Sequence, residues 1–208
     1  KIGNKTALKT LLDRLKKVQN IRNIIVLIPK NHNNNLLKKY LSSINIKFFR
    51  GSEKNVLDRY YKASLKFKSK NIIRITSDCP FLDVNILNKM TKIFSSNTYL
   101  DLLTNNNPSS FPNGYDVEIF KFSALKLAKN NTTSSYDKEH VTTFLKSSPA
   151  INKRNYFNDI DLSHLRLTLD TKKDLKILNN IHNLFKKNAN FDYSDIIKLY
   201  KKSLNFFK

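Results

Sequence analysis

Two carboxylates follow apolar runs that have the length and composition of buried strands. Asp78 comes shortly after Ile72–Thr76, and Asp170 directly follows Arg166–Leu169. Open α/β sheets bind ligands beyond the carboxyl ends of their strands, so both carboxylates are expected in one crevice. Two carboxylates, completed by phosphate oxygens and water, make a typical Mg²⁺ site. Each residue also has a plain structural explanation, because Asp78 suits the start of a turn and Asp170 the cap of a following helix.

The elements that must position these residues alternate between apolar runs and amphipathic stretches, which is typical of an α/β fold. We expect strands at 23–29, 44–49, 71–76, 99–103, 115–120, 151–157 and 165–169. Helices are expected at about 8–20, 34–43, from a cap at Ser52 to about Lys68, and at 83–94, 123–129, 138–146, 172–187 and 193–203. The sequence thus predicts one layered domain over 1–208, with a mixed, mostly parallel sheet and an antiparallel excursion around 105–160.

The composition excludes several classes of protein. With 208 residues, 40% hydrophobic and 11% aromatic, the chain is long and apolar enough to bury a core. No apolar run approaches the roughly 18–20 residues of a membrane span, and no signal peptide is recognised. The single cysteine, Cys79, excludes an internal disulfide and favours a reducing compartment, so a cytoplasmic location is expected. Cys79 itself is expected to pack in the interior.

The formal charge of +22 raises the alternative of a nucleic-acid-binding module. The distribution argues against specific binding of nucleic acid, because only seven of the 38 basic residues are Arg and the Lys residues are scattered among many Asn. Lys, Asn and Ile share AT-rich codons, so codon bias explains the composition equally well. Lysines are then expected over the whole surface.

Five blocks of the sequence resemble, in order, the spore coat polysaccharide biosynthesis protein F family. The resemblance covers about residues 5–200, and its order makes it more specific than any single block. The blocks are Arg50-Gly51-Ser52 through Asp58-Arg59-Tyr60-Tyr61, Arg74-Ile75-Thr76-Ser77-Asp78-Cys79-Pro80, Pro112-Asn113-Gly114-Tyr115-Asp116-Val117-Glu118, Glu139-His140-Val141-Thr142 and Arg166-Leu167-Thr168-Leu169-Asp170-Thr171.

That family is similar to the CMP-KDO synthetases and acylneuraminate cytidylyltransferases. The resemblance implies a three-layer, Rossmann-like nucleotide-diphospho-sugar transferase fold. It also implies that CTP and a sugar, acidic or nonulosonate-like, give a CMP-sugar and pyrophosphate for surface polysaccharide synthesis. By the same resemblance Asp78 and Asp170 hold Mg²⁺ and are the catalytic residues.

The resemblance also implies substrate-binding roles for basic residues. Arg50, with Gly51 and Ser52, and Arg59 face the phosphates or the carboxylate of the sugar, because Arg binds such anions bidentately. An ordinary surface ion pair is the alternative for Arg59. Arg166 is expected beside Asp170, where it steadies that carboxylate.

Acidic residues and a histidine complete the predicted site. Asp116 and Glu118, two apart on a strand, share one side and are expected to bind sugar hydroxyls. An ordinary acidic edge is the alternative. Glu139 and His140 are expected to close over the acceptor, with His140 either a base or a structural histidine at a helix start.

Two departures from the family matter. Its members begin with a strand and a nucleotide-binding loop, whereas this sequence starts at the later segment Gly3–Leu8, which resembles "GKPLL" with Thr6 for Pro. Asn55 stands where Asp is common. A non-catalytic member that serves as a binding partner is therefore the alternative function. The resemblance also suggests a homodimer formed through residues 105–160.

Overall fold

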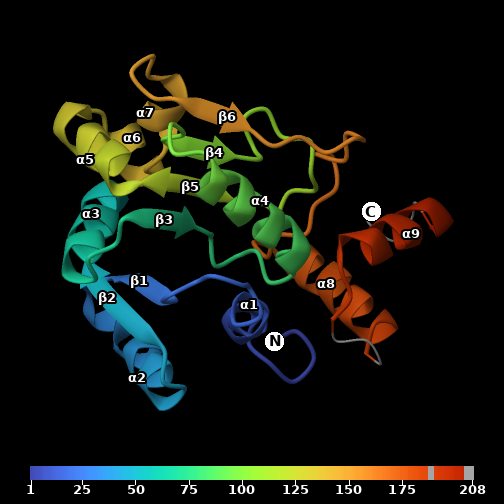
Figure 1. The fold of residues 1–208 in the computed structure, drawn as a ribbon. Coiled ribbons are helices and arrows are strands. Elements are labelled where there is room, and N and C mark those ends of the chain that lie inside the picture. The colour runs from blue at the N-terminus through green and yellow to red at the C-terminus, as the bar shows by residue number, and fades with distance from the viewer. Residues whose placement is uncertain (187–189, 204–208) are drawn as a thin grey trace.

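Helices and strands alternate as the sequence predicts (Figure 1). The computed structural model describes residues 1–186 and 190–203, so the predicted helix end at Lys187 lies outside the described residues. The strands are β1 (Ile25–Pro29), β2 (Lys47–Gly51), β3 (Asn71–Arg74), β4 (Leu102–Thr104), β5 (Glu118–Lys121) and β6 (Lys153–Asn155). The helices are α1 (Ala7–Leu15), α2 (Asn35–Ser43), α3 (Val56–Lys66), α4 (Val84–Ser96), α5 (Phe122–Asn131), α6 (Ser135–His140), α7 (Thr143–Ser147), α8 (Lys172–Leu184) and α9 (Tyr193–Lys202), with a short 3-10 helix η1 (His32–Asn34).

The strands form two sheets. β1 and β2 pair in parallel, and the second sheet has the order β3-β5-β4-β6. β5 is antiparallel to β3 and β4, whereas β6 is parallel to β4. β3, β4 and β6 therefore share one direction and β5 alone opposes them. The predicted mixed sheet with one antiparallel excursion is confirmed.

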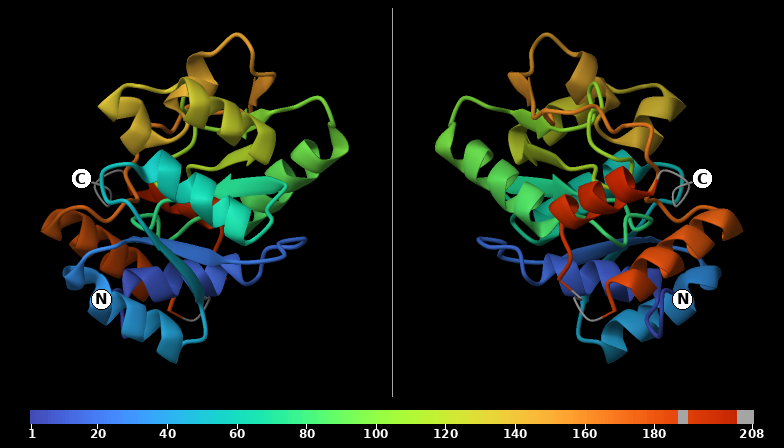
Figure 2. Two further views of the ribbon diagram at one scale, coloured as in Figure 1. Left: turned by 90° about the vertical axis from the view of Figure 1, so that its left-hand side faces the viewer. Right: turned by 90° about the vertical axis from the view of Figure 1, so that its right-hand side faces the viewer.

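Alternate residues of the four-stranded sheet face different layers of helices. Leu102, Phe120 and Ile72 lie level across three strands and pack in a cluster with α3, α5 and α7. Their neighbours Leu103 and Ile119 belong to the cluster that includes α1, α4 and α8. Figure 2 shows α3 and α5 next to each other, with α5 to β6 above and the N-terminal elements and α8 below. The predicted three-layer α/β architecture is confirmed.

Helix α1 lies where the two sheets meet. Its Leu12 packs with Ile28 of β1 and Leu41 of α2, in a cluster that covers the two-stranded sheet. The adjacent Leu11 packs into the cluster around α4 and α8. One helix thus joins the hydrophobic layers of both sheets. No helix in the described ranges is long and apolar enough to cross a membrane.

The single helix predicted over Lys138–Lys146 is wrong. α6 ends at His140 and α7 begins at Thr143, because Val141 takes φ 65° and ψ −53°. The Thr142 N–H donates to the His140 carbonyl oxygen at 2.7 Å. This is a γ-turn of the strained kind, and a β-branched residue rarely adopts a positive φ. The turn interrupts the helix and redirects the chain.

Two further predictions need correction. The strand expected over Leu165–Leu169 is replaced by an extended segment with one parallel bridge, between Asn113 and Arg166, because its partner is a loop. Ser52 does not cap α3. Asn55 is the N-cap, and the Ser52 hydroxyl instead accepts the Asn55 N–H at 3.0 Å in the preceding turn.

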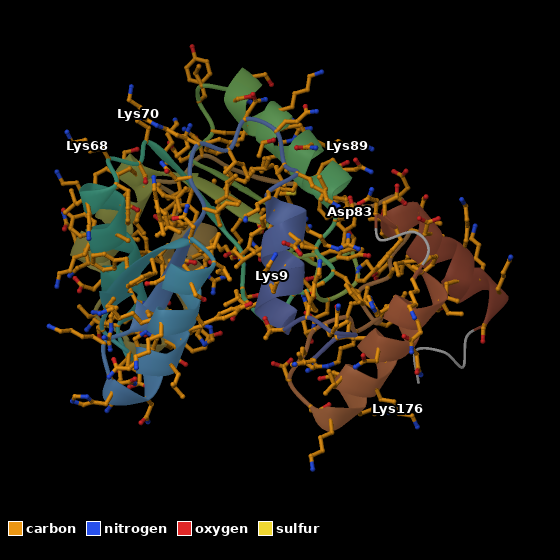
Figure 3. The ribbon with its side chains drawn as sticks, turned by 90° about the horizontal axis from the view of Figure 1, so that it is seen from below. Lys9, Lys68, Lys70, Asp83, Lys89 and Lys176 are labelled. Carbon is orange, nitrogen blue, oxygen red and sulfur yellow. The ribbon has the colours of Figure 1, made fainter. Side chains whose placement is uncertain are left out.

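Lysines lie on separate elements of the molecule. Figure 3 labels Lys9 on α1, Lys89 on α4 and Lys176 on α8, with Lys68 and Lys70 between α3 and β3. In this view Lys68 and Lys70 lie at the upper left, Lys9 at the centre, Lys89 at the right and Lys176 at the lower right. The labelled residues agree with the prediction that the positive charge is spread rather than gathered into one stripe.

Candidate active site

Polar side chains line up at the carboxyl end of β3. The register aligns Arg74, the last residue of β3, with Glu118, the first residue of β5. Glu118 is level in turn with Thr104 at the end of β4, and Thr104 with Asn155 at the end of β6. Because β3, β4 and β6 share one direction, their carboxyl ends meet here. This is the edge at which open α/β sheets bind ligands.

The loop after β3 places Asp78 at this edge. The Cys79 N–H donates to the Thr76 carbonyl oxygen at 3.4 Å, and the Leu169 N–H donates to the Asp78 carbonyl oxygen at 2.8 Å. The second contact brings the residue before Asp170 against Asp78. Cys79 is buried, and burial together with the Asp78 charge raises the pKa of its thiol. The predicted packing role of Cys79 is confirmed.

The segment around Gly114 packs against the same extended backbone. The Asn113 N–H donates to the Leu165 carbonyl oxygen at 2.9 Å, and the Asn113 carbonyl oxygen accepts the Leu167 N–H at 2.8 Å. Gly114 has φ 109°, and a Cβ there would lie 2.9 Å from the Leu167 carbonyl carbon, so glycine is required. The Asp116 carboxylate accepts the Gly114 N–H at 3.2 Å. Asp116 is thereby held close to the segment that carries Asp170.

These contacts bring three of the predicted acidic residues into one region. Asp78 and Asp170 flank the Leu169 contact, and Asp116 follows the glycine turn that packs on the same segment. The charges of Asp78 and Asp116 both act on the buried Cys79 thiol and raise its pKa further after burial. Three blocks far apart in the sequence therefore form one acidic site.

Arg166 lies beside Asp170, as predicted. Its Nη2 donates to Asp170 Oδ2 at 2.5 Å, and the two side chains are 45% and 49% exposed. The same guanidinium donates to Asp174 through Nε at 3.1 Å and through Nη2 at 3.3 Å. Asp174 is buried at the start of α8. Burial alone raises the pKa of Asp174, but Arg166 and backbone N–H donors outweigh it and hold that pKa well below its ordinary value.

Glu118 is buried in a network of donors. Its carboxylate is 2% exposed and pairs with Arg74 Nη1 at 2.7 Å and Lys146 Nζ at 2.6 Å. The Thr142 hydroxyl adds a hydrogen bond at 2.8 Å. Burial raises the pKa of Glu118, but the charges of Arg74 and Lys146 and the hydrogen bonds outweigh it and lower that pKa.

These contacts give Glu118 a structural role, because its carboxylate ties the ends of β3 and β5 to α7. Its sugar-binding role stays a prediction. The γ-turn at Val141 places Thr142 for this contact. Within the described residues no hydrogen bond or ion pair joins Glu118 or Asp116 to Arg50.

Arg50 lies near the end of β2, and Arg59, on α3, reaches back to the residue that follows β2. Arg50 donates from Nη1 to Asn35 Oδ1 at 3.0 Å and from Nη2 to the Asn31 carbonyl oxygen at 2.6 Å. Arg59 Nη1 donates to the Ser52 carbonyl oxygen at 2.9 Å. Neither guanidinium pairs with a carboxylate among residues 1–186 and 190–203. The surface ion pair considered for Arg59 is therefore absent from the described structure.

Both arginines also keep an unused donor. Their buried Nε atoms have no hydrogen-bond partner in the described part of the chain. Burial lowers the pKa of Arg59. Gly51 permits this packing, because a Cβ there would lie 2.8 Å from Arg59 Cγ. Two cations without acidic partners at the end of a strand are suited to binding an anion.

Glu139 and His140 lie apart from the acidic site. Both are exposed at the end of α6. The His140 ring contacts the Tyr136 ring, with centroids 4.3 Å apart. No contact in the described structure joins either residue to Asp78, so their acceptor-binding role stays a prediction.

Sequence reasoning missed four residues at this edge of the sheet: Arg74, Thr142 and Lys146, which hold Glu118, and Asp174, which holds Arg166. Two of them lie inside recognised blocks, Arg74 before Asp78 and Thr142 at the end of Glu139–Thr142. Asp174 had a signal of its own, since Thr171-Lys172-Lys173-Asp174 is a capping-box pattern. Lys146 had none.

A cavity of about 340 Å³ lies elsewhere. Ile24 and Lys47 line it at the amino ends of β1 and β2, opposite the edge described above. It contains none of the predicted site residues. The candidate site is therefore assigned from the acidic residues that lie near one another, Asp78, Asp116 and Asp170, and not from this cavity.

Comparison with known proteins identifies the family. A family model described as "Cytidylyltransferase" matches residues 1–207. The chain belongs to the cytidylyltransferase family. It is therefore a nucleotidyltransferase, and the family recognised from the five sequence blocks is confirmed.

Two curated relatives are similar over most of this cytidylyltransferase. An uncharacterized protein of Methanocaldococcus jannaschii is 34% identical over 180 residues, which are 85% of this chain and 72% of that protein. Spore coat polysaccharide biosynthesis protein SpsF of Bacillus subtilis is 25% identical over 185 residues, 85% of this chain and 74% of SpsF.

Solved structures agree with the family. A cytidylyltransferase from Leptospira borgpetersenii superposes with a TM-score of 0.94 at 29% identity, covering 100% of this chain and 87% of that one. CMP:2-keto-3-deoxy-manno-octonic acid synthetase, in complex with CTP, superposes with a TM-score of 0.64 at 11% identity over 90% of each chain. The second likeness shows the fold, which is the predicted nucleotide-sugar transferase fold.

Proposed function

We propose that this cytidylyltransferase transfers CMP from CTP to a hydroxyl of an acidic sugar and releases pyrophosphate, in the cytoplasm and for surface polysaccharide synthesis. One observation supports the proposal most directly: the 2.8 Å backbone contact between Leu169 and Asp78, which joins the segments that carry Asp78 and Asp170. Open α/β sheets bind ligands beyond the carboxyl ends of strands such as β3, which the Asp78 loop follows. The likeness to SpsF and to a CMP-sugar synthetase complexed with CTP supports the choice of nucleotide and product class.

The acidic site fits magnesium. Asp78 and Asp170 offer hard carboxylate oxygens, and the Asp170 side chain is half exposed. Across the described ranges no three His, Cys, Asp or Glu side chains gather as a ready metal site. Mg²⁺ suits such a set, because it takes one or two protein carboxylates and fills its remaining positions with phosphate and water oxygens. When bound, Mg²⁺ would screen the triphosphate charge.

The residues of the chain would then bind and orient the two substrates. Arg50 and Arg59, each with an unpartnered buried Nε, supply cations for the phosphates or for the carboxylate of the sugar. An arginine that the phosphates do not use would select an acidic acceptor over a neutral one. Asp116, half-buried beside Gly114, is placed to accept hydrogen bonds from sugar hydroxyls.

An added strand would complete the site. In the described structure β1 pairs only with β2, and β3 only with β5. Figure 1 shows β1 and β3 pointing the same way, one below the other. We propose that an extended segment outside these 208 residues pairs with both strands and leads into a phosphate-binding loop above Asp78. The test compares pyrophosphate release by this chain with release by the product of the complete open reading frame.

A homodimer through residues 105–160 is part of the same proposal. This stretch exposes the large apolar side chains of Leu127, Tyr136, Phe157 and Ile160. Burial of such a surface between two copies would stabilise a dimer. Light scattering during size exclusion should give twice the mass of one chain, and a single-chain mass would reject the dimer.

The central experiment is a nucleotide panel. The product of the complete open reading frame is supplied with CTP, UTP, ATP or GTP, Mg²⁺ and a set of acidic and neutral sugars, and pyrophosphate release is followed. Release is expected with CTP and an acidic sugar. Release with another nucleotide, or with neutral sugars alone, would contradict the proposal.

A further inference from the structure

The start of α8 contains a carboxylate that the proposed reaction does not use directly. Asp174 is 6% exposed, and Asp83 is the only other buried aspartate in the described part of the chain. Its Oδ1 accepts Arg166 Nε, and its Oδ2 accepts Arg166 Nη2 together with the backbone N–H groups of Asp170 and Thr171. The buried carboxylate of Asp174 therefore contacts both the Arg166 guanidinium and the backbone N–H of Asp170, the proposed metal ligand.

The three side chains form a short row. Arg166 lies between Asp170, at 2.5 Å, and Asp174, at 3.1 Å. One positive charge is shared by two carboxylates, so the row carries one net negative charge. The buried carboxylate contacts the guanidinium through two nitrogens, the fork geometry that fixes an Arg side chain. The exposed carboxylate, Asp170, contacts it through Nη2 alone.

We infer that Asp174 is a positioning residue that keeps Asp170 available to a divalent cation. This inference rests on the proposed function, in which Asp170 is a metal ligand. Asp174 shares the Arg166 charge with Asp170 and fixes the orientation of the guanidinium through two nitrogens. Without the Asp174 charge, Arg166 and Asp170 would form a neutral ion pair. A divalent metal ion would have to break this pair to bind Asp170. Residues that orient a metal ligand in this way typically change metal affinity by about 10–100-fold when replaced.

Asp174 has a second role that must be separated from the first. With Thr171 it forms the capping box of α8, so its replacement also affects the stability of the helix. The chain offers a matched control. Asp195 forms the same kind of capping box with Asp192 at the start of α9, and it has no contact with the acidic site.

The test measures binding rather than turnover. Mn²⁺ is titrated into the product of the complete open reading frame with a non-hydrolysable CTP analogue, and the free ion is followed by its paramagnetic resonance signal. Asp174→Asn is expected to weaken Mn²⁺ binding about tenfold or more. Both variants are expected to lower the melting temperature, because each loses a capping box. Asp195→Asn is expected to leave Mn²⁺ binding unchanged.

A double variant separates positioning from general damage. In a protein that already carries Arg166→Gln, Asp174→Asn should have little further effect on Mn²⁺ binding. The guanidinium that Asp174 restrains is then absent. Two results would overturn the inference and leave the proposed function standing. One is equal Mn²⁺ binding by Asp174→Asn and Asp195→Asn. The other is an Asp174→Asn effect on Mn²⁺ binding that is as large in the Arg166→Gln protein as in the unmodified one. If the unmodified protein binds no Mn²⁺, the proposed metal site fails, and the inference with it.

Discussion

The backbone N–H of Leu169 donates to the carbonyl oxygen of Asp78 at 2.8 Å. This hydrogen bond joins the loop after β3 to the segment that precedes α8. It holds the backbone next to Asp170 against the backbone of Asp78. A change that displaces the extended segment should therefore disturb both carboxylates.

Gly114→Ala is predicted to make such a change. The new Cβ would lie 2.9 Å from the Leu167 carbonyl carbon at a φ of 109°, so the segment must shift. The free energy of unfolding should fall by about 1–3 kcal/mol. Urea denaturation measures it, with Ser109→Ala in the neighbouring exposed loop as the control. Equal stability of the two variants would show that Gly114 is not required.

Glu118→Gln tests the buried ion network. The variant leaves Arg74 and Lys146 without their acidic partner, at a cost of about 3 kcal/mol near neutral pH. The pKa of Glu118 is lowered from its ordinary value of 4.5, so its stabilising contribution is present above that pH and is lost as the pH falls through the folded pKa.

Unfolding curves at several pH values check this prediction. The unmodified protein should lose stability below about pH 4.5 more steeply than Glu118→Gln. Glu139→Gln, at an exposed position, should follow the unmodified protein. Parallel pH profiles for all three proteins would show that the Glu118 charge does not stabilise the fold.

Thr142→Val tests the contact that the γ-turn provides. The hydroxyl donates to Glu118 at 2.8 Å in a buried position, and its loss should lower the free energy of unfolding by about 1–2 kcal/mol. Thr91→Val removes a hydroxyl that bonds only to the preceding turn of α4, and should cost less. The two variants are compared by thermal and urea unfolding, and the idea fails if Thr91→Val is the more damaging.

The spread of lysines predicts weak binding to nucleic acid. Replacement of Lys68 and Lys70 by Gln should leave CTP-dependent turnover unchanged, because both lie between α3 and β3, away from the acidic site. Retention of DNA should disappear at moderate salt for the unmodified protein and the variant alike. Sequence-selective DNA binding that survives moderate salt would favour the nucleic-acid alternative.

Local patterns in the sequence predicted the alternation of elements and the acidic site, because each depends on short stretches. Apolar runs predicted β1 and β3, and the polar residues that follow the second run indicated Asp78. The recognised blocks supplied the roles of Asp78 and Asp170. The contacts that hold Asp116 beside the segment leading to Asp170 join residues far apart in the sequence, and only the fold shows them.

Two of the failed predictions share a physical cause. Helical spacing around Lys138–Lys146 is sound locally, but the buried Glu118 draws Thr142 into a strained turn. The apolar run at Leu165–Leu169 is extended, yet its neighbour is the loop at Asn113, so it forms one bridge instead of a strand. Tertiary contacts decided both, and neither is visible from propensity.

The most direct test of the account is CTP-dependent pyrophosphate release by Asp170→Asn, made in the product of the complete open reading frame. Asparagine keeps the shape of the side chain but removes the negative charge proposed to hold the metal. Release should fall by about a hundredfold or more, while the melting temperature stays close to that of the unmodified protein. Asp159→Asn, at an exposed position, should retain full activity. Undiminished pyrophosphate release by Asp170→Asn would contradict the proposed site.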